Sequence, residues 1–190
     1  MSRSSFPFVR PLRASAIGCV AAAALTAALA GVASSAGGSP VDGAAVTDSV
    51  ASVPSCQTAG LALGLRARGN TLGSAYYALE FTNHSGHTCT LRGYPGVSAI
   101  SGRGRQLGSA ASRDNGRKTT TVRLRENGTA TATLRIAAAG NFQKSICRQV
   151  KAAGLRVFPP YQTASKTVRF RFPACTRRSA KYLSVQAVRP

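Results

Sequence analysis

The chain has 190 residues, a length that suits one domain with additional segments. Its 25 lysine and arginine residues face only 5 acidic residues, which gives a formal net charge of +20. So few carboxylates argue against enzymes that need acidic pairs, and the charge favours anionic partners without bearing on the fold. Arginine also outnumbers lysine 20 to 5, as in a high-GC genome, so solubility combined with codon bias is the alternative explanation of the charge.

The first 36 residues have the three parts of a secretory signal peptide. A basic start with Arg3, Arg10 and Arg13 precedes an apolar run over residues 14–33, and small residues up to Ala36 offer cleavage points. We expect cleavage, because the run is mostly alanine and therefore a weak membrane span. An uncleaved anchor is the alternative, and only in that case would the chain itself be held in a membrane.

Residues 37–55 are small and polar without periodicity, so we expect a disordered linker there. A single domain is expected to follow over residues 56–190. Cys19 lies inside the leader, and most of the apolar run comes after it, which argues against a lipidation site.

The cysteines that remain after the leader predict disulfides, since an even number in an exported chain indicates them. They are Cys56, Cys89, Cys147 and Cys175. Four cysteines allow three pairings, and we favour Cys56 with Cys89 and Cys147 with Cys175, which keep each bridge within one half of the domain. Free buried thiols are the alternative.

Short segments of alternating or β-branched residues, separated by Gly, Asn, Ser and Pro, fill the domain and predict strands. The expected strands cover residues 61–66, 76–82, 88–91, 97–101, 119–125, 129–136, 155–158, 168–172 and 183–188. In the segment 168–172 apolar residues alternate with Arg169 and Arg171, the mark of a strand with one buried face. This pattern predicts an all-β, immunoglobulin-like antiparallel β-sandwich.

Two local features of this fold are also expected. Residues 119–125 and 129–136 are expected to form a hairpin around residues 126–128. Apolar residues at a spacing of four, with Asn141 as a cap, predict one short helix over residues 142–153.

A longer pattern carries a family resemblance. Its parts are Cys56, the segments YALEFTN (77–83), SG (85–86) and TCTLRGYPGV (88–97), then Cys147, LRVFPP (155–160) and Cys175. In this order they resemble the actinobacterial secreted domains of the family named domain of unknown function 4232. The resemblance covers residues 56–190 and implies a β-sandwich on the outside of a Gram-positive cell, but it implies no activity.

The segment 88–97 has a structural interpretation as well. Pro95 and Gly96 suit the central positions of a type II turn, where glycine supplies a positive φ. We favour a strand–turn–strand scaffold. A binding loop that displays Tyr94 and Pro95 is the alternative.

Catalytic patterns are nearly absent from the sequence. The acids inside the expected domain are Glu80, Asp114 and Glu126, which are scattered, and neither Gly-x-Ser-x-Gly nor Ser-x-x-Lys occurs. A cysteine nucleophile would need one of the cysteines assigned to disulfides. We therefore expect no enzyme, no catalytic residue and no cofactor.

The histidines offer one metal-site hypothesis. His84 and His87 lie close to Cys89, and imidazole with thiolate suits zinc or copper, but only if Cys89 is free. We favour a polar loop at 83–87 without a metal.

Basic residues at outward positions of the expected strands and near the C-terminus form the one positive indication of a partner. They are Arg123, Arg125, Arg169, Arg171, Arg177, Arg178 and Lys181. Such rows suit the phosphates of an anionic cell-wall polymer or lipid headgroups, whereas nucleic acid is disfavoured by export and by few aromatics for stacking. Simple solvated faces are the alternative.

The leading hypothesis is thus a non-enzymatic module, secreted or extracellular and associated with the cell envelope, that binds anionic envelope polymers through a basic surface. The alternative is a hydrolytic or metal-dependent extracellular enzyme that uses Glu80, Glu126 or the pair His84 and His87.

Overall fold

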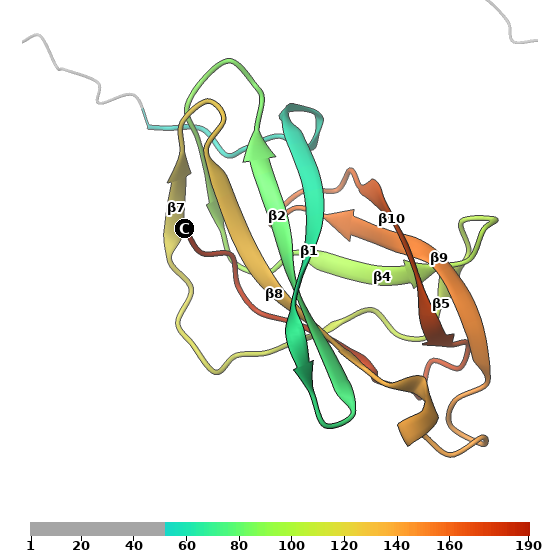
Figure 1. Ribbon diagram of the computed structural model, residues 1–190. Coiled ribbons are helices and arrows are strands. Elements are labelled where there is room, and N and C mark those ends of the chain that lie inside the picture. The colour runs from blue at the N-terminus through green and yellow to red at the C-terminus, as the bar shows by residue number, and fades with distance from the viewer. Residues whose placement is uncertain (1–51) are drawn as a thin grey trace, which may run out of the picture. The chain divides into compact units, whose positions relative to one another are not determined.

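The computed structural model describes residues 52–190 (Figure 1). The predicted signal peptide and most of the predicted linker, residues 1–51, lie outside the described residues. Near the start of the described part, Ser55 pairs with Thr90, whose amide donates to the Pro54 carbonyl at 2.8 Å. No helix within residues 52–190 has the length and apolar character needed to cross a membrane.

Eleven strands and two short 3₁₀ helices make up the described residues. They are η1 (Thr58–Gly60), β1 (Leu61–Thr71), β2 (Ser74–Asn83), β3 (Cys89–Arg92), β4 (Gly96–Ile100), β5 (Gln106–Leu107), β6 (Ser112–Arg113), β7 (Thr121–Leu124), β8 (Thr129–Ala137), η2 (Ala139–Asn141), β9 (Gln149–Phe158), β10 (Lys166–Cys175) and β11 (Leu183–Val185). Each strand expected from the sequence is present, and the short strands β5 and β6 are additional.

The strands form a five-stranded sheet in the order β1-β2-β8-β11-β6, a four-stranded sheet β10-β9-β4-β5 and the pair β3-β7. All neighbours are antiparallel except β11 and β6. Buried side chains of both large sheets meet in one core, among them Leu79 and Phe81 of β2 and Leu155 and Val157 of β9. The predicted all-β sandwich is therefore confirmed (Figure 1).

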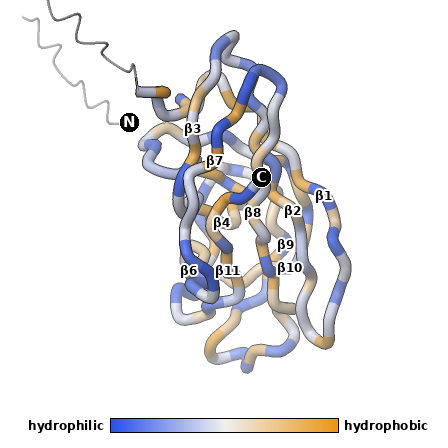
Figure 2. Tube along the Cα trace, turned by 90° about the vertical axis from the view of Figure 1, so that its left-hand side faces the viewer, coloured by the Kyte–Doolittle hydropathy of each residue, from blue (hydrophilic) through white to orange (hydrophobic). Residues whose placement is uncertain are grey.

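The alternation read from residues 168–172 is found in β10. Arg169 and Arg171 are exposed, whereas Phe172 is buried and Val168 and Phe170 pack against the core. Figure 2 shows the same alternation of hydrophobic and hydrophilic residues along several strands, with longer hydrophilic stretches in the loops. Burial of one row of side chains per strand accounts for this pattern.

Both predicted disulfides are confirmed. Cys56–Cys89 ties the segment before β1 to β3, and Cys147–Cys175 ties the segment before β9 to the end of β10. All four cysteines are buried. Each bridge thus anchors an irregular segment to a strand.

The prediction of a helix over residues 142–153 is wrong. A single turn forms, in which the Ile146 and Cys147 amides both donate to the Gln143 carbonyl at 2.9 Å, and β9 then begins at Gln149. β9 pairs with β10 on one side and β4 on the other. These two ladders satisfy the backbone of β9 on both edges, which outweighs the local helical spacing of the apolar residues.

The hairpin predicted around residues 126–128 is also wrong in its pairing. The turn exists, since the Gly128 amide donates to the Arg125 carbonyl at 2.9 Å and Asn127 has a φ of +62°. However, β7 pairs with β3, whereas β8 pairs with β2 and β11. The chain therefore changes sheets at this turn.

The type II turn predicted at Pro95 and Gly96 is wrong as well. Gly96 begins β4 and pairs with Phe158, which holds it extended, and the positive φ of +94° belongs to Gly93. The Tyr161 ring packs on Gly93, 3.5 Å from the place that a Cβ would take. Gly93 therefore supplies the positive φ of this bend, and its lack of a side chain lets the Tyr161 ring pack against the backbone.

Candidate functional site

Two basic side chains, Arg169 and Arg171, lie together on the outer face of the β10-β9-β4-β5 sheet. Arg169 pairs with Gly154, which in turn pairs with Ile100, so these three positions share the outer face. The register shifts between Arg169 and Phe172, where Phe170 and Arg171 lie opposite a single residue of β9. Such a bulge re-aims side chains, and here both arginines reach the same hollow.

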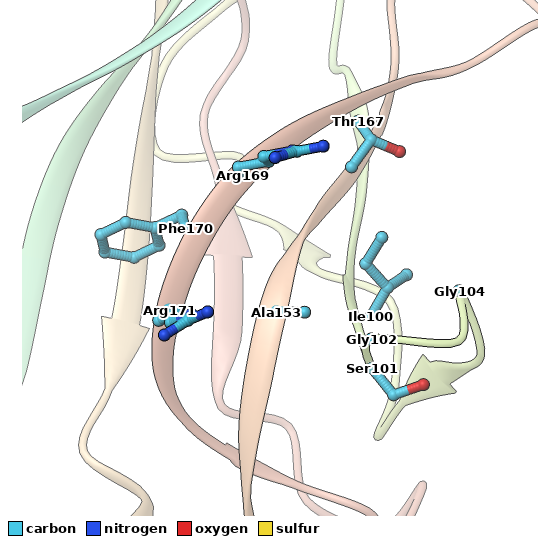
Figure 3. A pocket seen from close by; sticks show the side chains of 9 residues that line it. All are labelled: Ile100, Ser101, Gly102, Gly104, Ala153, Thr167, Arg169, Phe170 and Arg171. Atoms are coloured by element: carbon cyan, nitrogen blue, oxygen red, sulfur yellow. The ribbon is translucent and has the colours of Figure 1, made fainter.

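The hollow has a volume of about 500 Å³. Its lining residues are Thr167, Arg169, Phe170 and Arg171 of β10, Ala153 of β9, and Ile100, Ser101, Gly102 and Gly104 at the end of β4 and the turn that follows. In Figure 3, Arg169 and Arg171 extend from β10 on one side while the β4–β5 turn lies across from them, and the Phe170 ring points the other way. We call this hollow the arginine pocket.

The β4–β5 turn that forms the far wall is held by its own hydrogen bonds. The Gly104 amide donates to the Ser101 carbonyl at 2.9 Å, and Gly104 has a φ of +72°. Arg156 of β9 donates from Nη2 to the Gly104 carbonyl at 2.6 Å. Arg103 and Arg105 of the same turn are exposed and line a neighbouring hollow of about 410 Å³.

No carboxylate of the described residues neutralises the arginine pocket. Glu80 forms an ion pair with Arg66 at 2.8 Å. Glu126 accepts a hydrogen bond from the Gly86 amide at 2.7 Å. The third acid, Asp114, accepts a hydrogen bond from Gln186 Nε2 at 2.9 Å, which lowers the pKa of its carboxyl. All three are thus engaged away from the pocket.

The chemistry of this arrangement is that of an anion site. Guanidinium groups present planar pairs of N–H donors that match phosphate and carboxylate oxygens. Within residues 52–190, neither Arg169 nor Arg171 makes an ion pair. The glycines across the hollow leave room for a ligand, and the hydroxyl groups of Ser101 and Thr167 can add hydrogen bonds.

The seven basic residues predicted for anion binding do not form a single surface. Arg123 and Arg125 are exposed on or beside β7, and both Figure 1 and Figure 2 show β7 away from β10. Arg177, Arg178 and Lys181 are exposed in the connection from β10 to β11. Of the predicted set, Arg169 and Arg171 line a pocket together.

Sequence reasoning missed three arginines that belong to this face. They are Arg103, Arg105 and Arg156. The first two could have been found from the glycine-rich segment 101–105, in which two arginines alternate with glycine as in an exposed turn. Arg156 could not be placed, because its contact with Gly104 depends on the pairing of β9 with β4.

Neither residue of the alternative binding loop is fully exposed. Pro95 is buried, and Tyr94 is half-buried beneath Arg113, whose guanidinium carbon lies 5.6 Å from the ring centroid. A small hollow of about 200 Å³ is lined by Gly93, Tyr94, Arg113, Thr119 and Tyr161. Tyr161, which sequence reasoning did not single out, is the exposed aromatic of this hollow.

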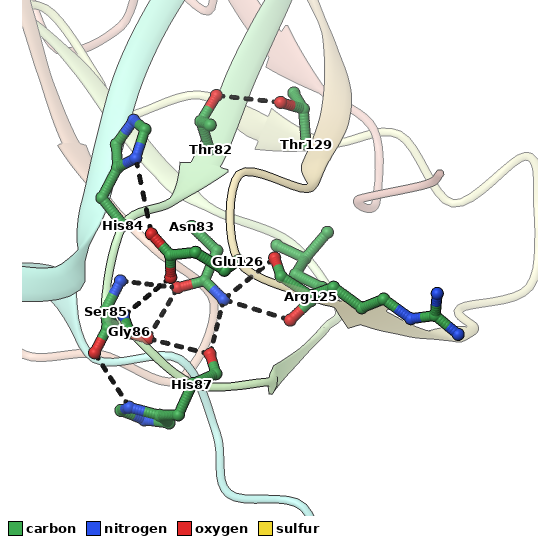
Figure 4. Close-up of polar contacts among 10 residues, drawn as sticks. Thr82, Asn83, His84, Ser85, Gly86, His87, Arg125, Glu126 and Thr129 are labelled. Carbon is green, nitrogen blue, oxygen red and sulfur yellow. Dashed lines mark hydrogen bonds and ion pairs between the residues drawn. The ribbon is translucent and has the colours of Figure 1, made fainter.

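The two histidines of the alternative metal-site hypothesis lie in a loop built on Asn83 (Figure 4). Cys89 is bonded to Cys56 and so offers no thiolate, while the His87 ring contacts the Ser85 carbonyl at 3.0 Å. His84 Nδ1 lies 3.9 Å from Glu126. No three His, Cys, Asp or Glu side chains of the described part of the chain come together as a ligand set.

Comparison with known proteins adds the family but no activity. No curated protein and no solved structure matches the chain. Residues 56–189, which include the whole arginine pocket, match the family described as Domain of unknown function (DUF4232). The chain therefore belongs to this family of domains of unknown function.

Proposed function

We propose that this domain is a non-enzymatic extracellular module that binds phosphate-bearing polymers of the cell envelope through the arginine pocket. The observation that carries the proposal is that Arg169 and Arg171 reach one hollow without a carboxylate partner among residues 52–190. Two guanidinium groups side by side suit a polymer with repeated phosphates, because each can bind two oxygens at once.

Export supports an envelope partner. Two disulfides are typical of an oxidising environment outside the cytoplasm. The basic, then apolar, then small-residue pattern of the first 36 residues supports secretion. The alanine- and arginine-rich composition, together with the family resemblance, supports an actinobacterial source.

A binding role is favoured over the alternative of a hydrolytic or metal-dependent enzyme. That alternative needs Glu80 or Glu126 as free acids, but Glu80 is paired with Arg66 and Glu126 holds the Gly86 amide. It also needs His84 and His87 near a metal, whereas the third candidate ligand, Cys89, is in a disulfide.

The test uses poly(glycerol phosphate), the backbone of a common wall polymer, as the probe. The double variant Arg169→Gln/Arg171→Gln is compared by calorimetry with Arg123→Gln/Arg125→Gln, which removes the same charge from the β7 region. We expect the first variant to lose about tenfold or more in affinity and the second to lose little. Binding of the unchanged domain should weaken as salt rises from about 50 to about 500 mM.

Two results would contradict the proposal. If the polymer does not bind even at low salt, the domain is not an anion-binding module of this kind. If both double variants lose affinity equally, the attraction comes from net charge and the arginine pocket is not the site.

A further inference from the structure

A second cavity differs from the arginine pocket in that its lining is mainly apolar. Its volume is about 390 Å³. It opens between the two large sheets, at the end where the β1–β2 turn meets η2. The lining residues are Asn70, Thr71, Gly73, Ser74, Ala75, Tyr77, Ile136, Ala137, Ala138, Ala139, Gly140, Gln149, Phe172 and Pro173. We call it the apolar cavity.

The apolar cavity is an unfilled continuation of the core. Ala75 and Tyr77 follow the same inward row of β2 as Leu79. Ile136 ends the inward row of β8, and Phe172 belongs to the inward row of β10. Around these side chains, small residues such as Ala75, Ala137 and Ala139 leave a space open to solvent. Pockets of this size and lining are typical of small-ligand sites.

The small residues that line the cavity lie on neighbouring strands of the five-stranded sheet and on the segment that follows β8. Ala75 pairs with Ile136, and the run Ala137 to Gly140 continues from β8 into η2. The rim is held in place, because the Ala138 amide and Asn141 Nδ2 donate to the Gly73 carbonyl at 2.9 and 3.1 Å. The cavity is thus built into hydrogen-bonded structure on both sides.

A basic hollow adjoins the apolar cavity. It has a volume of about 430 Å³ and shares Ala139, Gly140 and Gln149 with the cavity. Its charged lining residues are Lys144 and Arg148, and no acid lines either space within the described residues. Neither basic side chain makes an ion pair within residues 52–190.

We infer that the apolar cavity binds the alkyl chain of a single-chain anionic amphiphile, whose head group is held by Lys144 and Arg148. The apolar lining supplies the favourable transfer of methylene groups from water, and the two cations supply charge complementarity for a carboxylate or phosphate head. The site is separate from the arginine pocket, with which it shares no lining residue.

The test titrates the domain with monomeric dodecanoate, below the concentration at which micelles form, and follows backbone amide shifts by NMR. We expect shifts at residues 70–77 and 136–149. Dodecanol, which has the same chain without the charge, should bind about three- to tenfold more weakly, because it cannot pair with Lys144 and Arg148.

Two variants with matched controls locate the site. Ala75→Phe fills the cavity and should weaken dodecanoate binding about tenfold or more, since each excluded methylene costs about fourfold. Ala62→Phe, on the exposed face of β1, is its control. If Ala75→Phe does not fold, Ala138→Trp blocks the same cavity from its exposed rim.

The head-group part is tested by Lys144→Gln/Arg148→Gln, with Arg123→Gln/Arg125→Gln as the control of equal charge. We expect only the first pair to weaken dodecanoate, and neither to affect dodecanol. Three outcomes would overturn the inference: no binding of dodecanoate, binding that Ala75→Phe leaves intact, or binding to anionic vesicles alone without binding of the monomer. Equal affinity for dodecanol would overturn the anionic head group.

Discussion

Replacing Asn83 with alanine removes the side chain that joins the β2–β3 loop to the turn between β7 and β8 (Figure 4). Its Nδ2 donates to the carbonyls of His87, Leu124 and Arg125 at 2.8, 3.1 and 3.2 Å. Its Oδ1 accepts from the Ser85 amide at 3.0 Å and from the Ser85 hydroxyl at 2.7 Å. The Asn83 side chain is fully buried.

The expected loss can be worked out contact by contact. The contact with the Leu124 carbonyl is buried, and an unsatisfied buried acceptor costs about 1–3 kcal/mol. The contacts with His87, Arg125 and Ser85 are nearer the surface, so each costs about 0.5 kcal/mol after rehydration. We expect Asn83→Ala to lower the free energy of unfolding by about 3 kcal/mol, and Tm by about 10 °C.

Urea denaturation followed by circular dichroism measures this loss. Asn115→Ala, at an exposed loop position, is the control and should stay within about 0.5 kcal/mol of the unchanged protein. A loss below about 1 kcal/mol for Asn83→Ala would refute the reasoning, because it would mean that the loop is held without this side chain.

The isosteric change Asn83→Asp sharpens the test. It keeps the shape but places carboxylate oxygens against the Leu124 and Arg125 carbonyls, so it should destabilise more than Asn83→Ala at neutral pH. Protonation of the carboxyl restores a donor, so the difference between the two variants should shrink at about pH 4. A difference that does not change with pH would contradict this account.

Three further predictions follow from the buried parts of the fold. Cys147→Ser with Cys175→Ser opens a loop of 28 residues and should cost about 3–4 kcal/mol of unfolding free energy, measured by urea denaturation; a loss below about 1 kcal/mol would count against it. Burial raises the pKa of Tyr182, whose hydroxyl donates to Leu107, to about 12. Stability should therefore fall as pH rises from about 10, where the unfolded phenol titrates, towards 12, and Tyr182→Phe should remove this dependence. Gly108→Ala should cost about 2–3 kcal/mol in thermal melts, because φ is +68° and a Cβ would lie 2.7 Å from the Tyr182 ring; an unchanged Tm would rule out that clash.

Much of the fold was predictable because its signals are local. Alternation with a period of two identifies each long strand from its own residues, as Val122 and Leu124 do between exposed arginines. The disulfide pairing was also correct, because each bridge joins cysteines within one half of the domain.

The errors arose where distant segments decide the conformation. The apolar residues of segment 142–153 have the spacing of a helix. The residues from Gln149 onward nevertheless form a strand, because they pair with β4 and β10. The turn at 126–128 was placed correctly, but which sheets its flanking strands join depends on β2 and β3, about 40 residues earlier in the chain.

For the candidate site, the sequence alone determined that the domain is a basic, disulfide-bonded β fold and that Arg169 and Arg171 face outward from one strand. Only the tertiary structure decided that the β4–β5 turn, held by Arg156, meets those two arginines around one hollow. The reason is physical: the period of a strand is set by its own backbone, whereas its neighbours are selected by long-range pairing and by burial of the shared core.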